Sequence, residues 1–98
     1  MKVMISQPMR GKTNEQIKKE REELVKKIEE QGHKVIDTIL TDKPPIDCDE
    51  ATYFLGRSIE LMSKADAIVF MKGWEKARGC RIEHQIAKDY GKFIKEEQ

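Results

Sequence analysis

A single glutamate near the start of a predicted helix is the residue in this chain best placed to do chemistry. Glu83 comes four residues after Gly79, and both follow residues 67–71, an apolar run that predicts a buried strand. In open α/β sheets, ligands bind in the crevice at the carboxyl ends of the strands, so this spacing brings a carboxylate close to that crevice. Such a carboxylate could attack an electrophilic carbon, as in glycosyl transfer. On spacing alone, an exposed helix glutamate is the commoner outcome.

A second polar segment, residues 6–12, follows the first predicted strand. Ser6, Arg10 and Gly11 provide a hydroxyl, a guanidinium group and a glycine just ahead of a helix. Backbone N–H groups at a helix start and an arginine fork suit a phosphate or a carboxylate. The segment has neither the Walker spacing nor the dinucleotide fingerprint. An ordinary strand-to-helix turn with a solvated Arg10 explains the pattern equally well.

Three residues around Glu83 could add contacts to a ligand, and each also has an ordinary structural explanation. Trp74 could stack on a base or ring, or it could cap the core. Arg78, next to Gly79, could hold an anion, although solvated charge is the simpler interpretation. His84 could carry a proton, but a lone helix histidine is more often a surface or packing residue.

The elements that must position these residues alternate along the chain. The patterns predict strands at residues 3–5, 34–39, 67–71 and 92–95, and helices from Thr13 to Gly32, at 50–63 and at 79–90. This alternation predicts one α/β domain over residues 1–98, with a four-stranded parallel sheet and helices on both faces. The expected architecture is a small flavodoxin-like three-layer sandwich with strand order 2-1-3-4. Residues 6–12 and 72–78 would then meet at the switch point between the first and third strands.

Two local patterns fix the ends of these elements. Thr13 with Gln16 three residues later predicts a capping box, and Gly32 predicts the stop of the first helix. Asp66, before the third strand, is expected at the far end of the sheet from the crevice, bonding to nearby backbone N–H groups.

Composition excludes several classes of function. The 98 residues contain 19 basic and 18 acidic side chains, mixed along the chain, which argues against binding a nucleic acid polymer through its phosphates. No apolar run approaches the ~20 residues of a membrane span, so we expect no membrane association. The apolar segment at residues 1–6 is too short for a secretory signal, so we expect a cytoplasmic location.

Cysteine and histidine usage predicts no metal site and no cofactor. The two cysteines, Cys48 and Cys80, and the two histidines, His33 and His84, lack the spacing of metal ligands. Reduced thiols are therefore the simplest expectation for both cysteines.

Four blocks along the chain resemble one known family. They are residues 5–11 (Ile-Ser-Gln-Pro-Met-Arg-Gly), 65–69 (Ala-Asp-Ala-Ile-Val), 79–87 (Gly-Cys-Arg-Ile-Glu-His-Gln-Ile-Ala) and 90–92 (Tyr-Gly-Lys). Over nearly its whole length, the chain resembles the nucleoside 2-deoxyribosyltransferase-like family. That family includes small nucleotide N-glycosidases and phage or bacterial relatives of unassigned function.

The resemblance implies a reaction and a set of site residues. Glu83 matches the glutamate that attacks the anomeric carbon of a (deoxy)ribosyl group and releases the base. Water or a second base then resolves the glycosyl-enzyme intermediate with retention. The front loop holds the sugar or its 5′-phosphate in the family. Ser6, Arg10 and Gly11 match that role in this chain. The full set of expected binding residues also includes Gln7, Trp74, Arg78 and Gly79.

Two positions depart from the family pattern and keep a second function open. The family usually has an aspartate where this chain has Ser58, and often a polar or acidic residue where it has Ala77. Without them, a nucleotide-binding or sensing module that has lost the chemistry is the alternative to an enzyme. A purely structural or partner-binding domain is the third possibility.

The resemblance and the short chain both favour self-association. In related proteins a neighbouring subunit often completes the site, and a short chain buries a small share of its surface, so we expect a homodimer or a larger homo-oligomer. The expected interface is an exposed stripe of the second helix, formed by Tyr53, Phe54, Leu61 and Met62. The helical pattern also points Tyr53 or Phe54, Ile59 and Met62 inward.

Overall fold

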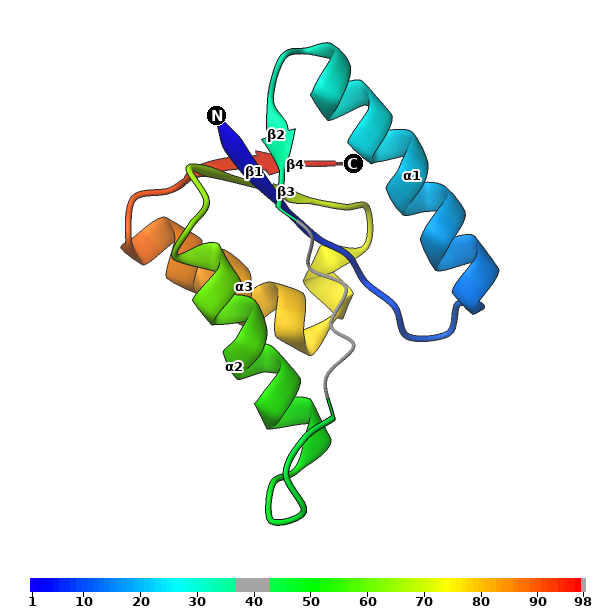
Figure 1. Ribbon diagram of the computed structural model, residues 1–98, viewed down its shortest axis with the longest axis vertical. Coiled ribbons are helices and arrows are strands. Elements are labelled where there is room, and N and C mark those ends of the chain that lie inside the picture. The colour runs from blue at the N-terminus through cyan, green and yellow to red at the C-terminus, as the bar shows by residue number, and fades with distance from the viewer. Residues whose placement is uncertain (37–42, 98) are drawn as a thin grey trace.

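Four parallel strands form one sheet in the order β2-β1-β3-β4, which confirms the predicted α/β fold (Figure 1). The computed structural model describes residues 1–36 and 43–97. The strands are β1 (Lys2–Ser6), β2 (Lys34–Val35), β3 (Ala67–Phe70) and β4 (Phe93–Glu96). Every pairing is parallel, with β1 between β2 and β3 and with β4 at one edge. The architecture is that of a small flavodoxin-like sheet, and its switch point lies between β1 and β3.

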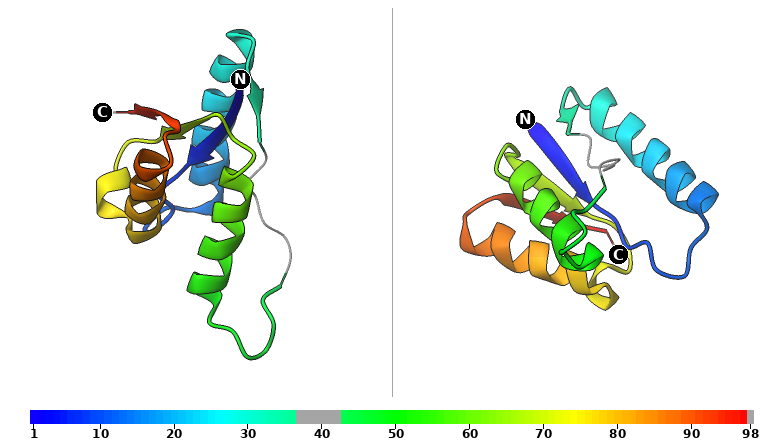
Figure 2. Two further views of the ribbon diagram at one scale, coloured as in Figure 1. Left: turned by 90° about the vertical axis from the view of Figure 1, so that its left-hand side faces the viewer. Right: turned by 60° about the horizontal axis from the view of Figure 1, so that its bottom comes forward.

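Three helices cover the two faces of this sheet. They are α1 (Asn14–Glu30), α2 (Glu50–Met62) and α3 (Arg78–Asp89), and a short 3-10 helix, η1 (Trp74–Lys76), precedes α3. Helix α1 lies on one side of the sheet, while α2 and α3 lie together on the other (Figure 2). In the described part of the chain, no helix is both long and apolar enough to cross a membrane.

The core consists of two clusters, one on each face of the sheet, because successive strand side chains point to opposite sides. On the α2 and α3 side, Met4, Ile68 and Phe70 pack with residues of both helices. On the α1 side, buried residues of β1 and β3 pack against Ile28, with Leu24 and Val25 at the margin. The prediction that the third strand is buried on both faces is therefore confirmed.

The predictions for the two ends of the first helix and for Asp66 are also confirmed. Thr13 accepts the backbone N–H of Gln16, and the Gln16 side chain accepts the backbone N–H of Thr13, which completes the capping box. Gly32 follows α1 with a φ of 86°, a conformation that favours glycine. At the amino end of the sheet, Asp66 accepts the backbone N–H of Lys2 at 2.8 Å.

Two expectations differ from the structure, and a third falls partly outside the described residues. The predicted strand at 34–39 is described only as Lys34–Val35, with Ile36 also donating its N–H to Val3; residues 37–39, like part of the predicted loop 41–49, lie outside the described residues. The segment 72–78, expected to be a loop, contains η1. The placement of Met62 on an exposed stripe is wrong and its inward placement is confirmed, because the residue is 2% exposed and packs in the core.

Candidate functional site

The carboxyl group of Glu83 is buried at the switch point and bonded to the end of β1. Glu83 is 7% exposed, although it belongs to a helix rich in charged side chains. Ser6, the last residue of β1, donates its hydroxyl to Oε1 of Glu83 at 3.0 Å. The second oxygen, Oε2, makes no hydrogen bond to any residue that the structure describes. The expectation of an ordinary exposed helix glutamate is therefore wrong.

Burial dominates the electrostatics of this carboxyl group. It raises the pKa of Glu83 from 4.5 to about 7, and the hydrogen bond from Ser6 opposes the rise. Within residues 1–36 and 43–97, no lysine, arginine or histidine forms an ion pair with Glu83. A buried carboxyl group without a cation partner is costly to the fold, and such groups concentrate at functional sites.

A thiol lies on the same helix, one turn before Glu83. Cys80 is 5% exposed and is not in a disulfide. Burial raises the pKa of the Cys80 thiol; a hydrogen bond with Ser6 lowers it, and the nearby Glu83 charge raises it. Ser6 thus contacts two ionisable groups of α3, Cys80 and Glu83. No spacing or motif in the sequence groups Cys80 with the site.

Glu83 lines a cavity of about 1380 Å³ whose walls come from the end of β1, from α1, from α2 and from the start of α3. Much of its wall is apolar, from Ile17 and Val25 on α1 and from Phe54 and Leu55 on α2. An apolar cavity with a few polar groups is the usual form of a small-molecule site. Its polar and charged lining residues are Gln7, Asn14, Lys18, Arg21, Glu22, Lys26, Glu29, Asp49, Thr52, Ser58, Arg78 and Glu83.

Two of the charged lining residues, Asp49 and Arg78, stand at the starts of α2 and α3. Asp49 is the N-cap of α2 and accepts the backbone N–H of Thr52 at 2.8 Å. The bonds from Thr52, and to a smaller extent the charge of Arg78, lower the pKa of the Asp49 carboxyl group. Arg78 is the first residue of α3, so both helices begin at the cavity wall.

The structure brings together only some of the residues predicted for the site. Gln7, Arg78 and Gly79 line the cavity with Glu83. Ser6 lies behind Glu83, where it is 2% exposed and holds the carboxyl group instead of facing the cavity. The remaining two front-loop residues, Arg10 and Gly11, are exposed and are not part of the cavity lining.

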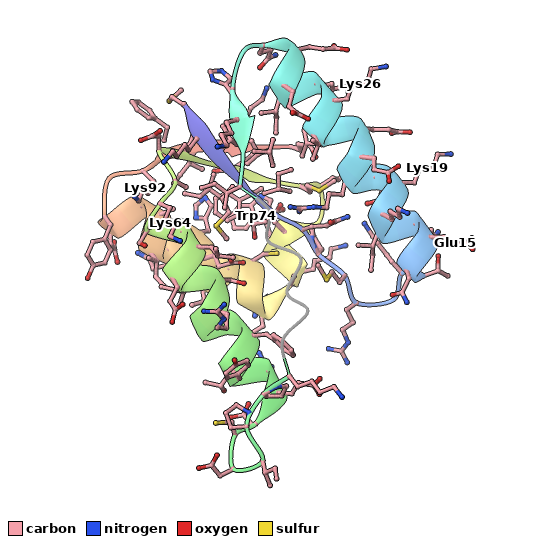
Figure 3. All side chains as sticks on the ribbon, in the orientation of Figure 1. Glu15, Lys19, Lys26, Lys64, Trp74 and Lys92 are labelled. Atoms are coloured by element: carbon pink, nitrogen blue, oxygen red, sulfur yellow. The ribbon has the colours of Figure 1, made fainter. Side chains whose placement is uncertain are left out.

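Trp74 is placed as a cap on the core. Its indole ring stacks on the His84 imidazole, with ring centroids 4.1 Å apart and planes 12° apart, and its centroid is 5.5 Å from that of Phe70. The His84 Nε2 atom in turn lies 3.0 Å from Oε1 of Glu96 on β4. Figure 3 shows Trp74 in the crowded centre of the molecule, whereas Glu15 and Lys19 point outward from α1. Trp74 does not line the cavity that contains Glu83.

A buried arginine of the cavity wall was not predicted from the sequence. Arg21 is 7% exposed and lines the cavity from α1. Its neighbours in sequence are lysines and glutamates, which conceal it among solvated charges. The available signal was its spacing, because Ile17, Arg21, Val25 and Ile28 fall on one stripe of the helix.

Metal binding finds no support in the geometry. The part of the chain that the structure describes has no group of three or more histidine, cysteine, aspartate or glutamate side chains that could hold a metal ion. The site consists instead of one buried carboxyl group, its hydroxyl partner and an amphipathic cavity.

The sequence matches a known family over nearly its whole length. The sequence model of a family described as "Domain of unknown function (DUF4406)" matches residues 1–96. No curated protein and no solved structure matches the chain.

Proposed function

The chain belongs to the DUF4406 family, and from its site we propose that it cleaves the N-glycosidic bond of a nucleoside or nucleotide, or exchanges its base, with Glu83 as the nucleophile. The observation that carries the proposal is the buried Glu83 carboxyl group, which lines a cavity and has a hydroxyl partner but no cation partner among the described residues. The resemblance to nucleoside 2-deoxyribosyltransferase-like proteins supplies the reaction class.

The proposed reaction has two steps at the anomeric carbon. An oxygen of ionised Glu83 forms an ester bond to that carbon while the carbon–nitrogen bond breaks, and the bonding electrons leave with the base, which gains a proton. Water or a second base then attacks the same carbon and releases the Glu83 carboxylate. Because each displacement inverts the anomeric carbon, the two together retain its configuration. Ser6 steadies Oε1 throughout, which leaves Oε2 for the attack.

The ionisation of Glu83 sets the expected dependence of the first step on pH. Only the carboxylate is a nucleophile, and burial raises the pKa of Glu83 to about 7. The first step should therefore accelerate as the pH rises through about 7 and level off above it. This raised pKa also keeps a substantial share of the group uncharged at neutral pH, which lessens the penalty of burying it.

Nucleoside 2-deoxyribosyltransferase-like proteins usually carry an assisting aspartate on the second helix, and this chain has no direct replacement for it. Ser58 lines the cavity at that position. Glu60 and Glu75, the nearest alternatives in sequence, are exposed and do not line the cavity. The other carboxylates of the cavity wall are Glu22, Glu29 and Asp49.

The test is release of free base from a panel of nucleosides, 2′-deoxynucleosides and their 5′-monophosphates. We expect the protein to release base from at least one member and Glu83→Gln to release none. Glu75→Gln is the matched control, because Glu75 is an exposed carboxylate ahead of the same helix and outside the cavity. No release from any member, or equal release by Glu83→Gln, would refute the proposal.

A nucleotide-binding or sensing module is the second candidate. Two observations favour it: Ser58 stands in the cavity wall where a carboxylate is usual, and Ala77 caps α3 without a side-chain hydrogen bond. Calorimetry distinguishes the two. Nucleotide binding without base release, unchanged by Glu83→Gln, would favour the module over the enzyme.

We also propose that the protein acts in the cytoplasm as a homodimer or larger homo-oligomer. Two free cysteines, one of them exposed, suit a reducing compartment. The half-buried apolar residues Tyr53, Phe54 and Leu61 on α2 are available for an interface, and a chain of this length buries only about 60–65% of its unfolded surface. Sedimentation at micromolar concentration tests this, and a monomer would contradict it.

A further inference from the structure

The side chain of Gln7 leaves a hydrogen-bond acceptor unpartnered beside the cavity. Gln7 follows Ser6 at the end of β1 and is 8% exposed. Its Nε2 donates to the backbone carbonyl oxygen of Ile17 on α1 at 2.8 Å. Its Oε1 is buried and has no hydrogen-bond partner among the described residues. Buried polar atoms are almost always paired, so an unpaired one calls for an explanation.

The orientation of this carboxamide follows from its single bond. The Ile17 carbonyl oxygen can only accept, so the nitrogen of Gln7 must face it and the oxygen must face the other way. Gln7 and Glu83 both line the cavity. Because consecutive strand side chains point to opposite sides, Ser6 and Glu83 lie toward α3 while Gln7 lies toward α1. A ligand that spans the end of β1 would meet both residues.

We propose that Gln7 is a specificity-determining residue whose Oε1 accepts a hydrogen bond from an uncharged O–H or N–H donor of the bound nucleoside. The terminal torsion of glutamine is soft, so a modest turn brings Oε1 to the cavity. A phosphate dianion offers no donor and would face a carbonyl oxygen, so the α1 side of the cavity takes a hydroxyl or amino group. This inference rests on the proposed nucleoside ligand.

The test compares ligands that differ by one donor. Binding is measured by calorimetry with the Glu83→Gln protein, which cannot turn the ligand over. The probes are adenosine, its 2′-, 3′- and 5′-deoxy forms, and purine riboside, which lacks the amino group. Weaker binding of a deoxy form would show that the donor is the missing sugar hydroxyl, and weaker binding of purine riboside would show that it is the amino group of the base. We expect one of these losses to weaken binding roughly 10- to 100-fold, the effect of leaving a buried acceptor unpaired.

Two substitutions of Gln7 then decide whether this residue causes the discrimination. Gln7→Met has a similar length but no acceptor. In this variant, adenosine and the analogue that lacks the decisive donor should have dissociation constants within about threefold of each other. Gln7→Glu keeps acceptor oxygens and should retain the preference for the donor. Thermal unfolding followed by circular dichroism verifies that each variant is folded.

The outcomes separate this inference from the proposed function. If nucleosides release base but the preference survives in folded Gln7→Met, the inference is overturned and the proposed function stands. If no nucleoside binds, the inference is overturned; the proposed function is overturned as well only if no 5′-monophosphate of the panel releases base either. If donor loss has no effect at any position in the Gln7 protein, the inference is also overturned.

Discussion

Removing the Ser6 hydroxyl should make Glu83 harder to ionise. The Ser6 hydroxyl donates to Oε1 at 3.0 Å inside the fold, and this bond favours the charged form of the carboxyl group. A hydrogen bond to a charged group contributes about 1.5–3 kcal/mol, and one pKa unit corresponds to about 1.4 kcal/mol. In Ser6→Ala, we therefore expect the pKa of Glu83 to rise from about 7 by about one to two further units.

The assay is a titration of the Glu83 side-chain carboxyl carbon by NMR, with the signal assigned by its absence in Glu83→Gln. The control is Cys80→Ala, which removes the adjacent thiol but leaves the Ser6 hydroxyl in place, so its midpoint should stay near that of the unmodified protein. If base release is found, its rate profile in Ser6→Ala should move to higher pH by the same interval. A midpoint that is unchanged or lower in Ser6→Ala would refute the assignment of Ser6 as the partner of the carboxylate.

Three further predictions follow from the described contacts. Folded Glu83 keeps a proton that the unfolded chain releases above pH 4.5, so the free energy of unfolding should fall by about 3 kcal/mol as the pH rises from about 4.5 past 7. Urea titrations at several pH values should show that Glu83→Gln loses this dependence of stability on pH. The same dependence in Glu83→Gln would contradict the prediction. Trp74→Ala should lower thermal stability, by about 3 kcal/mol or more, because the indole packs on His84 and Phe70; a stable variant that fails to bind ligand would instead place Trp74 in the site. Thr13→Ala should cost about 1 kcal/mol by removing the α1 cap, measured by denaturant unfolding, and no loss would count against the capping box.

The fold was predictable because its signals are local. The apolar run of β3 and the capping box at Thr13 each lie within a few residues, and alternating strands and helices leave few topologies. Asp66 was placed correctly for the same reason, since the start of a parallel strand lies at the end of the sheet opposite the crevice. The exposure of Met62 was mispredicted because its burial depends on the residues that α2 and β3 bring around it.

The site was less predictable because its contacts are long-range. Spacing placed Glu83 near the crevice, but its burial depends on Ser6, which is 77 residues away in sequence. The same limit applies to Trp74, whose stacking on His84 requires η1 to fold back on α3. Arg21 was hidden because a buried arginine and a solvated one look alike within a charged helix.

The central claim, that Glu83 is the nucleophile, is tested most directly by mass spectrometry of the quenched reaction. A nucleoside whose sugar carries fluorine at the 2′ position slows breakdown of a glycosyl ester and so favours its accumulation. The account predicts that the peptide containing Glu83 gains the mass of the sugar, and that Glu83→Gln gains none. Release of base with no adduct on that peptide, or an adduct on another residue, would contradict it.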